Sequence, residues 1–194
     1  MWSKIRSLFV WQNTVPDIIS PAFSPGGTGW LFALDLIRND ASAIVKIPVE
    51  LKNMRFIRDA VSVNGMIIGY INDVLTTPGA DSWDNHQIYR TAVKQNIDAI
   101  DCVPSKHMTD DLLVDYVRTG AATLESKYGN KAVFRIPYDL LTEDIIVEAV
   151  KVNGNLLPLL KESVDKRFLT RRVYSEAVNN APEVTSYVPE FIRE

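Results

Sequence analysis

A short pattern, Ala-Val followed by any two residues and then Asn, occurs three times in this 194-residue chain. The three copies are AVSVN (60–64), AVKQN (92–96) and AVKVN (149–153). Recurrence at intervals of a few tens of residues indicates a chain built from repeated units, which determines the whole fold. Aligning on the alanine gives seven equivalent anchor positions: Phe9, Leu36, Ala60, Ala92, Tyr116, Ala149 and Ala177.

Each anchor lies in a segment with helical periodicity. The anchor, the residue after it, and the residues three and four before it share one face of a helix. Of these 28 positions only Arg6 is not apolar. A second apolar segment follows the anchor helices, and in five copies it ends at a proline, which lacks the amide hydrogen that a continuing helix needs. These prolines are Pro21, Pro48, Pro104, Pro137 and Pro189. The sequence therefore predicts an all-α, solenoid-like array of about seven degenerate helix–turn–helix repeats, forming one domain over residues 1–194.

Asparagine marks the turn between the two helices of several copies. Asn64-Gly65 and Asn153-Gly154 occupy this place, and Asn13 and Asn96 are equivalent to them. Helices often end on a residue in the left-handed conformation, which Gly and Asn tolerate best. We therefore expect a left-handed turn here.

The repeat is interrupted in three places. Residues 1–28 break the register of the second helix, as expected of an N-terminal capping repeat. Residues 76–85 and about 121–130 are insertions. Insertions in repeat arrays tend to gather on the binding face, so these interruptions are candidate functional regions.

Composition narrows the functional classes. A formal net charge of −3 argues against nucleic acid, which needs a basic face. No stretch approaches the roughly 18 apolar residues of a membrane span. Cys102 is the single cysteine, which favours a reducing compartment, and we expect a cytoplasmic protein.

No arrangement of residues predicts catalysis, a metal or a cofactor. The glycine-rich segment 25–29 lacks the ending of a phosphate-binding loop. His86 and His107 have no clear co-ligands, and Cys102 has no nearby base. The carboxylates of TDDLLVDYV (109–117) and TEDIIVEAV (142–150) recur with the repeat, so helix capping explains them. We expect a non-enzymatic protein, although a site assembled in space stays an open alternative.

Two groups of residues are candidates for binding a protein partner. Trp83 and Asp84 lie in the polar insertion, and exposed tryptophan is typical of interface hot spots. Residues 161–172 carry five basic residues against two acidic ones, and Lys166, Arg167, Arg171 and Arg172 could meet an acidic partner or an RNA backbone. A solvated helix face is the alternative explanation.

The units DLLVDYVRTG, IYRTAVKQNIDAIDCVP and IIVEAVKVNGNLLPLL resemble an uncharacterised family of short tandem helical repeats. Its units have the form Asp-x-x-hydrophobic-hydrophobic-x-Ala-Val-x-x-Asn-Gly. The resemblance covers roughly residues 84–190 and implies a source among phages, giant viruses or intracellular bacterial pathogens. It implies no catalytic residues.

These features favour a protein-binding module over other classes, because a repeat array offers an extended surface. The resemblance suggests a phage or pathogen factor that binds and modulates a host protein in the host cytoplasm. The main alternative is a structural or virion component that associates with copies of itself.

Overall fold

The computed structural model describes residues 24–48, 51–76, 85–122 and 129–193. Within these ranges every regular element is an α-helix or a 3₁₀-helix, and no strand occurs. The all-α prediction is confirmed. The predicted capping repeat over residues 1–28 lies almost entirely outside the described residues, since only its last five residues are included.

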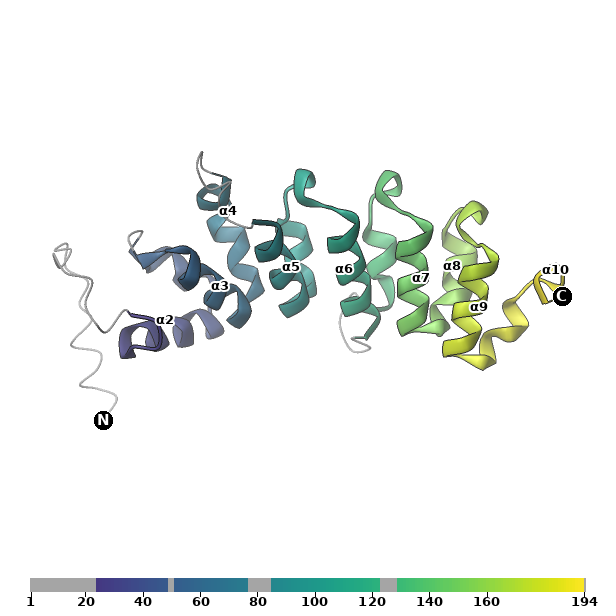
Figure 1. The fold of residues 1–194 in the computed structure, drawn as a ribbon, viewed down its shortest axis with the longest axis horizontal. Helices are drawn as coiled ribbons and strands as arrows, with labels where there is room; N and C mark the ends of the chain where they lie inside the picture. The colour runs from purple at the N-terminus through teal and green to yellow at the C-terminus, as the bar shows by residue number, and fades with distance from the viewer. Residues whose placement is uncertain (1–23, 49–50, 77–84, 123–128, 194) are drawn as a thin grey trace.

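Six α-helices carry the anchor positions of the described ranges. They are α2 (Thr28–Asn39), α3 (Met54–Val63), α5 (Asn85–Gln95), α6 (Asp110–Ala122), α7 (Glu143–Val152) and α9 (Arg171–Asn180). Each packs against the next along the chain, in the order α2, α3, α5, α6, α7, α9. The described part is therefore elongated, with its helices side by side (Figure 1).

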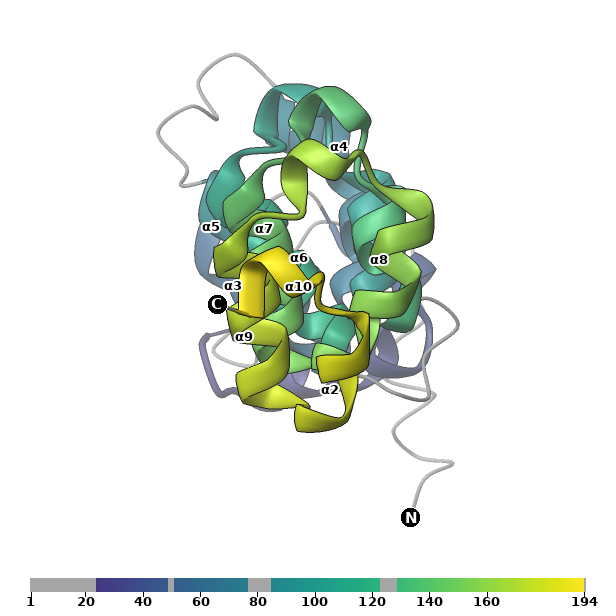
Figure 2. The same ribbon diagram turned by 90° about the vertical axis from the view of Figure 1, so that its right-hand side faces the viewer.

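The second helical segment of each predicted copy is short. It is a 3₁₀-helix in η3 (Ala41–Lys46), η7 (Ile97–Cys102), η9 (Gly129–Arg135) and η13 (Pro182–Tyr187). In two copies a 3₁₀ turn leads into an α-helix: η5 (Gly65–Ile67) into α4 (Ile68–Thr76), and η11 (Gly154–Leu156) into α8 (Leu157–Ser163). Viewed along the long axis, α8 lies on the opposite side from α7 and α9 (Figure 2). Short 3₁₀ segments of this kind are common as connectors between helices.

A third short turn precedes most of the later anchor helices. These turns are η8 (Ser105–His107), η10 (Tyr138–Leu140) and η12 (Lys166–Phe168), and α10 (Glu190–Arg193) follows η13. The sequence pattern did not predict them as separate elements. Each follows a proline or an aspartate that starts the turn: Pro104, Pro137 and Asp165.

The core consists of the apolar positions that the sequence predicts. On α3, α5, α6 and α7 all four positions of the anchor face are buried. In the second segments every predicted apolar position is buried, and only the polar Thr185 is exposed. The exceptions lie on the first and last anchor helices: on α2 Phe32 is half-buried and Leu36 is 44% exposed, and on α9 Val178 is half-buried. Helical periodicity thus identified the core almost completely.

The left-handed turn predicted at asparagine is wrong. Asn64, Asn96 and Asn153 have extended backbones, with φ of −151°, −145° and −144°. Each side-chain oxygen accepts a hydrogen bond from the amide two residues later, at 3.1, 2.9 and 3.1 Å respectively. Asparagine is therefore suited to this corner because it caps the following segment, not because it tolerates positive φ. Asn13 lies outside the described residues.

The glycines after two of these asparagines allow very close packing between neighbouring helices. A Cβ atom on Gly65 would lie 2.3 Å from the carbonyl oxygen of Ala92, the next anchor. A Cβ on Gly154 would lie 2.3 Å from the carbonyl oxygen of Ala177. Both contacts are with backbone, which cannot rotate away. Glycine is therefore required at each corner by its lack of a side chain.

The turn at each of these two glycines is hydrogen-bonded to an amide side chain of the next anchor helix. The Gly65 amide donates to Gln95 Oε1 at 2.5 Å, and Gln95 Nε2 donates to the Val63 carbonyl at 3.2 Å. Asn180 makes the equivalent pair of bonds: it accepts from the Gly154 amide at 2.7 Å and donates to the Lys151 carbonyl at 2.9 Å. Backbone polar groups at the end of one helix thus find their hydrogen-bond partners on the neighbouring helix.

Replacing Gly154 with alanine should destabilise the chain by about 1–3 kcal/mol, because the new methyl group overlaps the Ala177 carbonyl and forces the helices apart. Urea denaturation followed by circular dichroism measures the change. Alanine at the exposed Glu162 is the control and should change stability by less than about 0.5 kcal/mol. A fully stable Gly154→Ala protein would contradict the close-contact model.

Asn180 and Asn179 provide a matched pair on one helix. Asn180→Ala removes both bonds to the preceding corner and leaves the Gly154 amide without its acceptor, so a loss of about 1–3 kcal/mol is expected. Asn179 is exposed, and its replacement by alanine should be nearly neutral. Equal denaturation midpoints for the two variants would show that the Asn180 bridge does not stabilise the corner.

Candidate functional site

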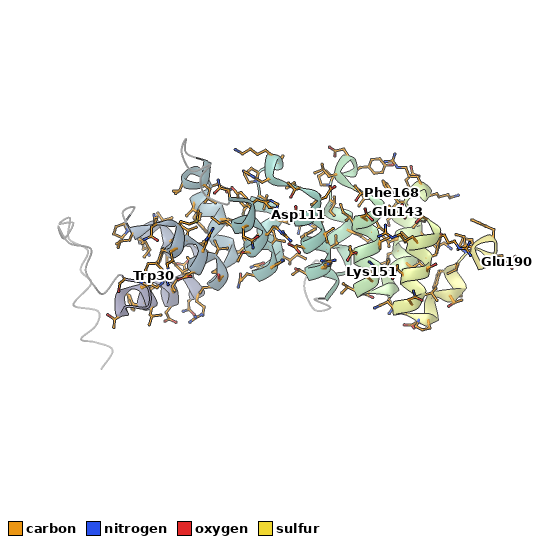
Figure 3. All side chains as sticks on the ribbon, in the orientation of Figure 1. Trp30, Asp111, Glu143, Lys151, Phe168 and Glu190 are labelled. Carbon is orange, nitrogen blue, oxygen red and sulfur yellow. The ribbon has the colours of Figure 1, made fainter. Side chains whose placement is uncertain are left out.

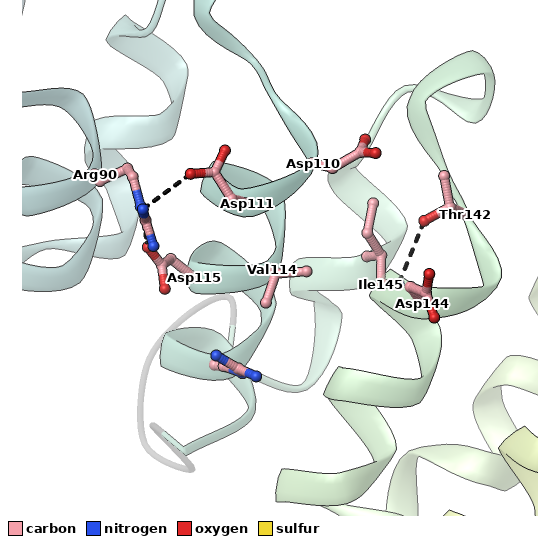
Figure 4. A pocket seen from close by; sticks show the side chains of 9 residues that line it. Arg90, Asp110, Asp111, Val114, Asp115, Thr142, Asp144 and Ile145 are labelled. Atoms are coloured by element: carbon pink, nitrogen blue, oxygen red, sulfur yellow. Dashed lines mark hydrogen bonds and ion pairs between the residues drawn. The ribbon is translucent and has the colours of Figure 1, made fainter. Parts of the chain in front are cut away.

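A surface pocket of ≈ 340 Å³ lies where α5, α6 and α7 meet. We call it the α6–α7 pocket (Figure 4). Asp111 and Glu143, near the starts of α6 and α7, lie along the same side of the molecule (Figure 3). The pocket is lined by Arg90, Asp110, Asp111, Val114, Asp115, Arg118, Thr142, Asp144 and Ile145.

The twin helix starts in the sequence supply most of this lining. Thr142 caps α7 by accepting the Ile145 amide at 3.4 Å, as its sequence predicts. At the start of α6 the Thr109 hydroxyl instead donates to Asp111 Oδ1 at 2.5 Å. Both starts therefore bring acidic residues to the same surface, with Val114 and Ile145 as the apolar part between them.

Charged side chains on neighbouring helices pair across the pocket. Asp115 is only 5% exposed, and its Oδ2 accepts from Arg90 Nε at 2.6 Å and lies 3.1 Å from Lys94 Nζ. A buried carboxylate is costly unless it is paired and hydrogen-bonded in this way. Arg90 Nη1 also lies 2.9 Å from Oδ2 of Asp111. Arg90 of α5 thus pairs with both an exposed acid, Asp111, and a buried acid, Asp115, of α6.

A second cross-helix pair flanks the first. Arg118 Nη2 lies 2.6 Å from Glu148 Oε2, which joins α6 to α7. Burial acts to raise the pKa of Glu148, but hydrogen bonds from Lys151 and Arg118 outweigh it and lower that pKa overall. The two pairs hold α5, α6 and α7 in one arrangement around the pocket.

Asp111 is the most strongly perturbed acid of the pocket. Its hydrogen bond from Thr109, and then that from His86 (Nε2 to Oδ2, 2.7 Å), lower its pKa to about 2. A proton donor near neutral pH needs a raised pKa. Asp111 is therefore suited to accept hydrogen bonds or to attract a cation, not to donate a proton.

Asp110 is the pocket carboxylate with the greatest freedom. It is exposed, and it forms no hydrogen bond or ion pair with the part of the chain that the structure describes. Asp144 is also exposed but pairs with Arg172. The rim of the pocket thus has one carboxylate that is available to a partner.

The predicted basic cluster is divided by the structure. Lys166 and Arg167 lie in η12, and Arg171 and Arg172 begin α9. Arg172 is committed to Asp144 on α7 and so joins two helices. Lys166 and Arg171 are exposed. Arg167 lies over the aromatic rings of Tyr138 and Phe168. The other predicted binding residues, Trp83 and Asp84, lie outside the described residues.

The predicted insertions lie largely outside the described ranges. α4 ends at Thr76 and α5 begins at Asn85, and residues 77–84 between them are not described. α6 continues to Ala122 and η9 begins at Gly129, so that 123–128 fall outside as well. Neither insertion contributes a described binding surface.

The histidines and the cysteine occupy ordinary positions. His86 lies in α5 beside Asp111, and the His107 ring packs against Tyr89 with centroids 4.9 Å apart. Burial, followed by the charge of Asp101, raises the pKa of the half-buried Cys102 thiol, which disfavours a reactive thiolate. Across the described residues no group of His, Cys, Asp and Glu is placed to hold a metal ion.

The sequence did not predict the α6–α7 pocket. The sequence feature that bears on the pocket is the pair of matching helix starts TDDLL and TEDII, whose acids helix capping also explains. Capping does not show that successive helix starts stack, and this stacking places their acids on one surface.

None of the helices in the described ranges has the length and apolar character needed to cross a bilayer. Neither a family model nor a curated protein nor a solved structure matches the chain.

Asp111→Asn should lower stability at neutral pH, by less than about 1 kcal/mol because the group is half exposed. The folded pKa of Asp111 is depressed to about 2, so its contribution is fully present above the ordinary value of 3.8. That contribution is lost as the pH falls through about 2. Urea denaturation of both proteins between pH 6 and pH 2 should show the difference narrowing with acid. A difference that stays constant over this range would rule out the ionised carboxylate as its source.

Proposed function

We propose that the chain is a solenoid-like array of about seven degenerate helix–turn–helix repeats that works as a non-enzymatic protein-binding module. The stacking of six anchor helices in chain order supports the array. A stack of this kind offers a long surface assembled from neighbouring units, which suits a macromolecular partner. The resemblance to repeats of phages and intracellular pathogens favours a host protein as that partner, met in the host cytoplasm.

The α6–α7 pocket is the observation that carries the proposal. It combines an apolar part, Val114 and Ile145, with a charged rim. This is the composition of interface sites at which a side chain of a partner inserts. The paired charges around it fix the pocket walls before binding, which lowers the entropy cost of association.

Catalysis by this pocket is disfavoured by its electrostatics. Asp115, Asp111 and Asp144 are held in ion pairs. The pKa of Asp111 is lowered, so this carboxyl is a poor proton donor at neutral pH. These properties favour binding over acid–base chemistry.

Affinity capture tests the proposal. The tagged chain is incubated with lysate of its native host cells, and bound proteins are quantified by mass spectrometry. A partner should be enriched by the wild type and reduced at least about fivefold by Val114→Arg, which fills the pocket. Val45→Arg, the same replacement at a valine that is 60% exposed on η3 and lies outside the pocket, is the control and should retain the partner. Circular dichroism checks that both variants are folded.

A partner held equally by wild type and Val114→Arg would place binding elsewhere on the surface. No partner in any native lysate would reject the protein-binding function.

Self-association is the second candidate. It is favoured by exposed apolar side chains toward the two ends of the described stack: Leu31 and Leu36 on α2, and Phe191, 80% exposed, on α10. Light scattering over a hundredfold range of concentration separates the two functions. A persistent monomer would reject self-assembly, whereas growth with concentration that Leu36→Asp abolishes would support it.

A further inference from the structure

An arginine lies over two aromatic rings at the edge of the stack. The guanidinium carbon of Arg167 lies 4.9 Å from the ring centroid of Tyr138 and 4.5 Å from that of Phe168. The two rings pack edge to face with centroids 5.9 Å apart. We call these three residues the Arg167 platform.

Successive turns of the stack build the platform. Tyr138 belongs to η10 and Phe168 to η12, so that two neighbouring copies contribute one ring each. Phe168 is buried and fixes the base, whereas Tyr138 is 54% exposed. Asp165 positions Tyr138, since its Oδ2 accepts from the tyrosine hydroxyl at 3.1 Å. Its Oδ1 accepts from the Arg167 amide at 2.9 Å.

The charged edge of the Arg167 guanidinium is not used within the described protein. No carboxylate oxygen of the described residues lies within 4.0 Å of the guanidinium nitrogens of Arg167. The two oxygens of the nearby Asp165 accept from the Tyr138 hydroxyl and from the Arg167 backbone amide. Lys166 and Arg171 are also exposed and form no ion pair with the described residues. Arg172 differs, because it is committed to Asp144.

We propose that the Arg167 platform binds an acidic segment of a partner protein, with a carboxylate against the free edge of the guanidinium. This proposal rests on the protein-binding function proposed above and names the chemistry of the partner. Arginine presents a planar fork of donors that matches a carboxylate with two parallel hydrogen bonds. Stacking on the rings holds that fork in place before binding, which reduces the entropy lost on association. Exposed tyrosine and arginine are also the residue types enriched at hot spots.

The surroundings favour an acidic peptide over nucleic acid. Five cations of residues 161–172 are exposed, but Lys161 donates to the Tyr187 carbonyl and Arg172 pairs with Asp144. Lys166, Arg167 and Arg171 are left, and the exposed acids Asp139, Glu162 and Asp165 lie in neighbouring turns of the chain. A nucleic-acid backbone needs an extended basic surface, because its affinity comes from many phosphate contacts. A short acidic segment needs only one fork and one or two supporting charges. Lys166 and Arg171 can supply those charges.

Fluorescence anisotropy with a defined probe tests the proposal on the full chain. The probe is a fluorescein-labelled dodecapeptide of alternating Glu and Gly, and the same peptide with Gln in place of Glu is the uncharged control. The Glu peptide should bind and the Gln peptide should not. Arg167→Lys keeps the charge but loses the fork and should weaken binding at least about fivefold. Tyr138→Ala keeps every charge but removes one ring and should weaken binding in the same direction.

Arg55→Gln is the matched control. Arg55 is an exposed arginine on α3 that forms no ion pair with the described residues, far along the stack from α9. Its replacement removes one positive charge from the chain, which neither Arg167→Lys nor Tyr138→Ala does, and should leave peptide binding unchanged. Circular dichroism of each variant checks the fold.

Several results would overturn the proposal. Equal binding of the Gln peptide, or wild-type affinity in Arg167→Lys, would show that no carboxylate fork forms. An equal loss in Arg55→Gln would show attraction by net charge alone. Tighter binding of a labelled oligouridylate than of the Glu peptide would assign the platform to nucleic acid. If peptide binding fails while Val114→Arg still releases a captured partner, the platform proposal fails and the protein-binding function stands.

Discussion

Glycine allows successive helices to approach one another very closely. Gly65 and Gly154 lie so near the backbones of Ala92 and Ala177 that no side chain fits between them. This spacing brings the amide of Gln95 or Asn180 within reach of the preceding corner. It also explains the Ala-Val-x-x-Asn-Gly pattern as a set of contacts between copies: the asparagine caps within one copy, and the glycine receives the alanine backbone of the next.

The same spacing determines where charge can lie. Side chains on adjacent anchor helices are close enough for Arg90 to meet Asp115, for Arg118 to meet Glu148 and for Arg172 to meet Asp144. Asp115 is buried and depends on its partners, whereas the exposed pairs contribute little stability individually. The main effect of these ion pairs is to fix the walls of the α6–α7 pocket. A few charged groups, Asp110 and Arg167 among them, have no ion-pair partner in the described part of the chain.

Properties that repeat along the sequence were predictable, and properties that depend on a neighbouring copy were not. The buried faces followed from helical spacing, because the four inner anchor helices α3, α5, α6 and α7 bury the same four positions. The extended conformation of Asn64 did not follow, since Asn-Gly is equally typical of a left-handed turn. The commitment of Arg172 to Asp144 and the stacking of Arg167 on Tyr138 join residues almost thirty positions apart. Only the packing of one copy on the next brings such residues together.

The Asn-Gly corners have a consequence for the chemical ageing of the protein. Asparagine followed by glycine is the sequence most prone to deamidation, in which the glycine nitrogen attacks the asparagine side chain to form a succinimide. At Asn64 and Asn153 that nitrogen already donates a hydrogen bond to Gln95 or Asn180 of the next helix. The asparagine side chain is held as a cap on the following turn. Deamidation at these corners therefore requires neighbouring helices to separate first, so that accumulated aspartate and isoaspartate at positions 64 and 153 would record how often the stack opens.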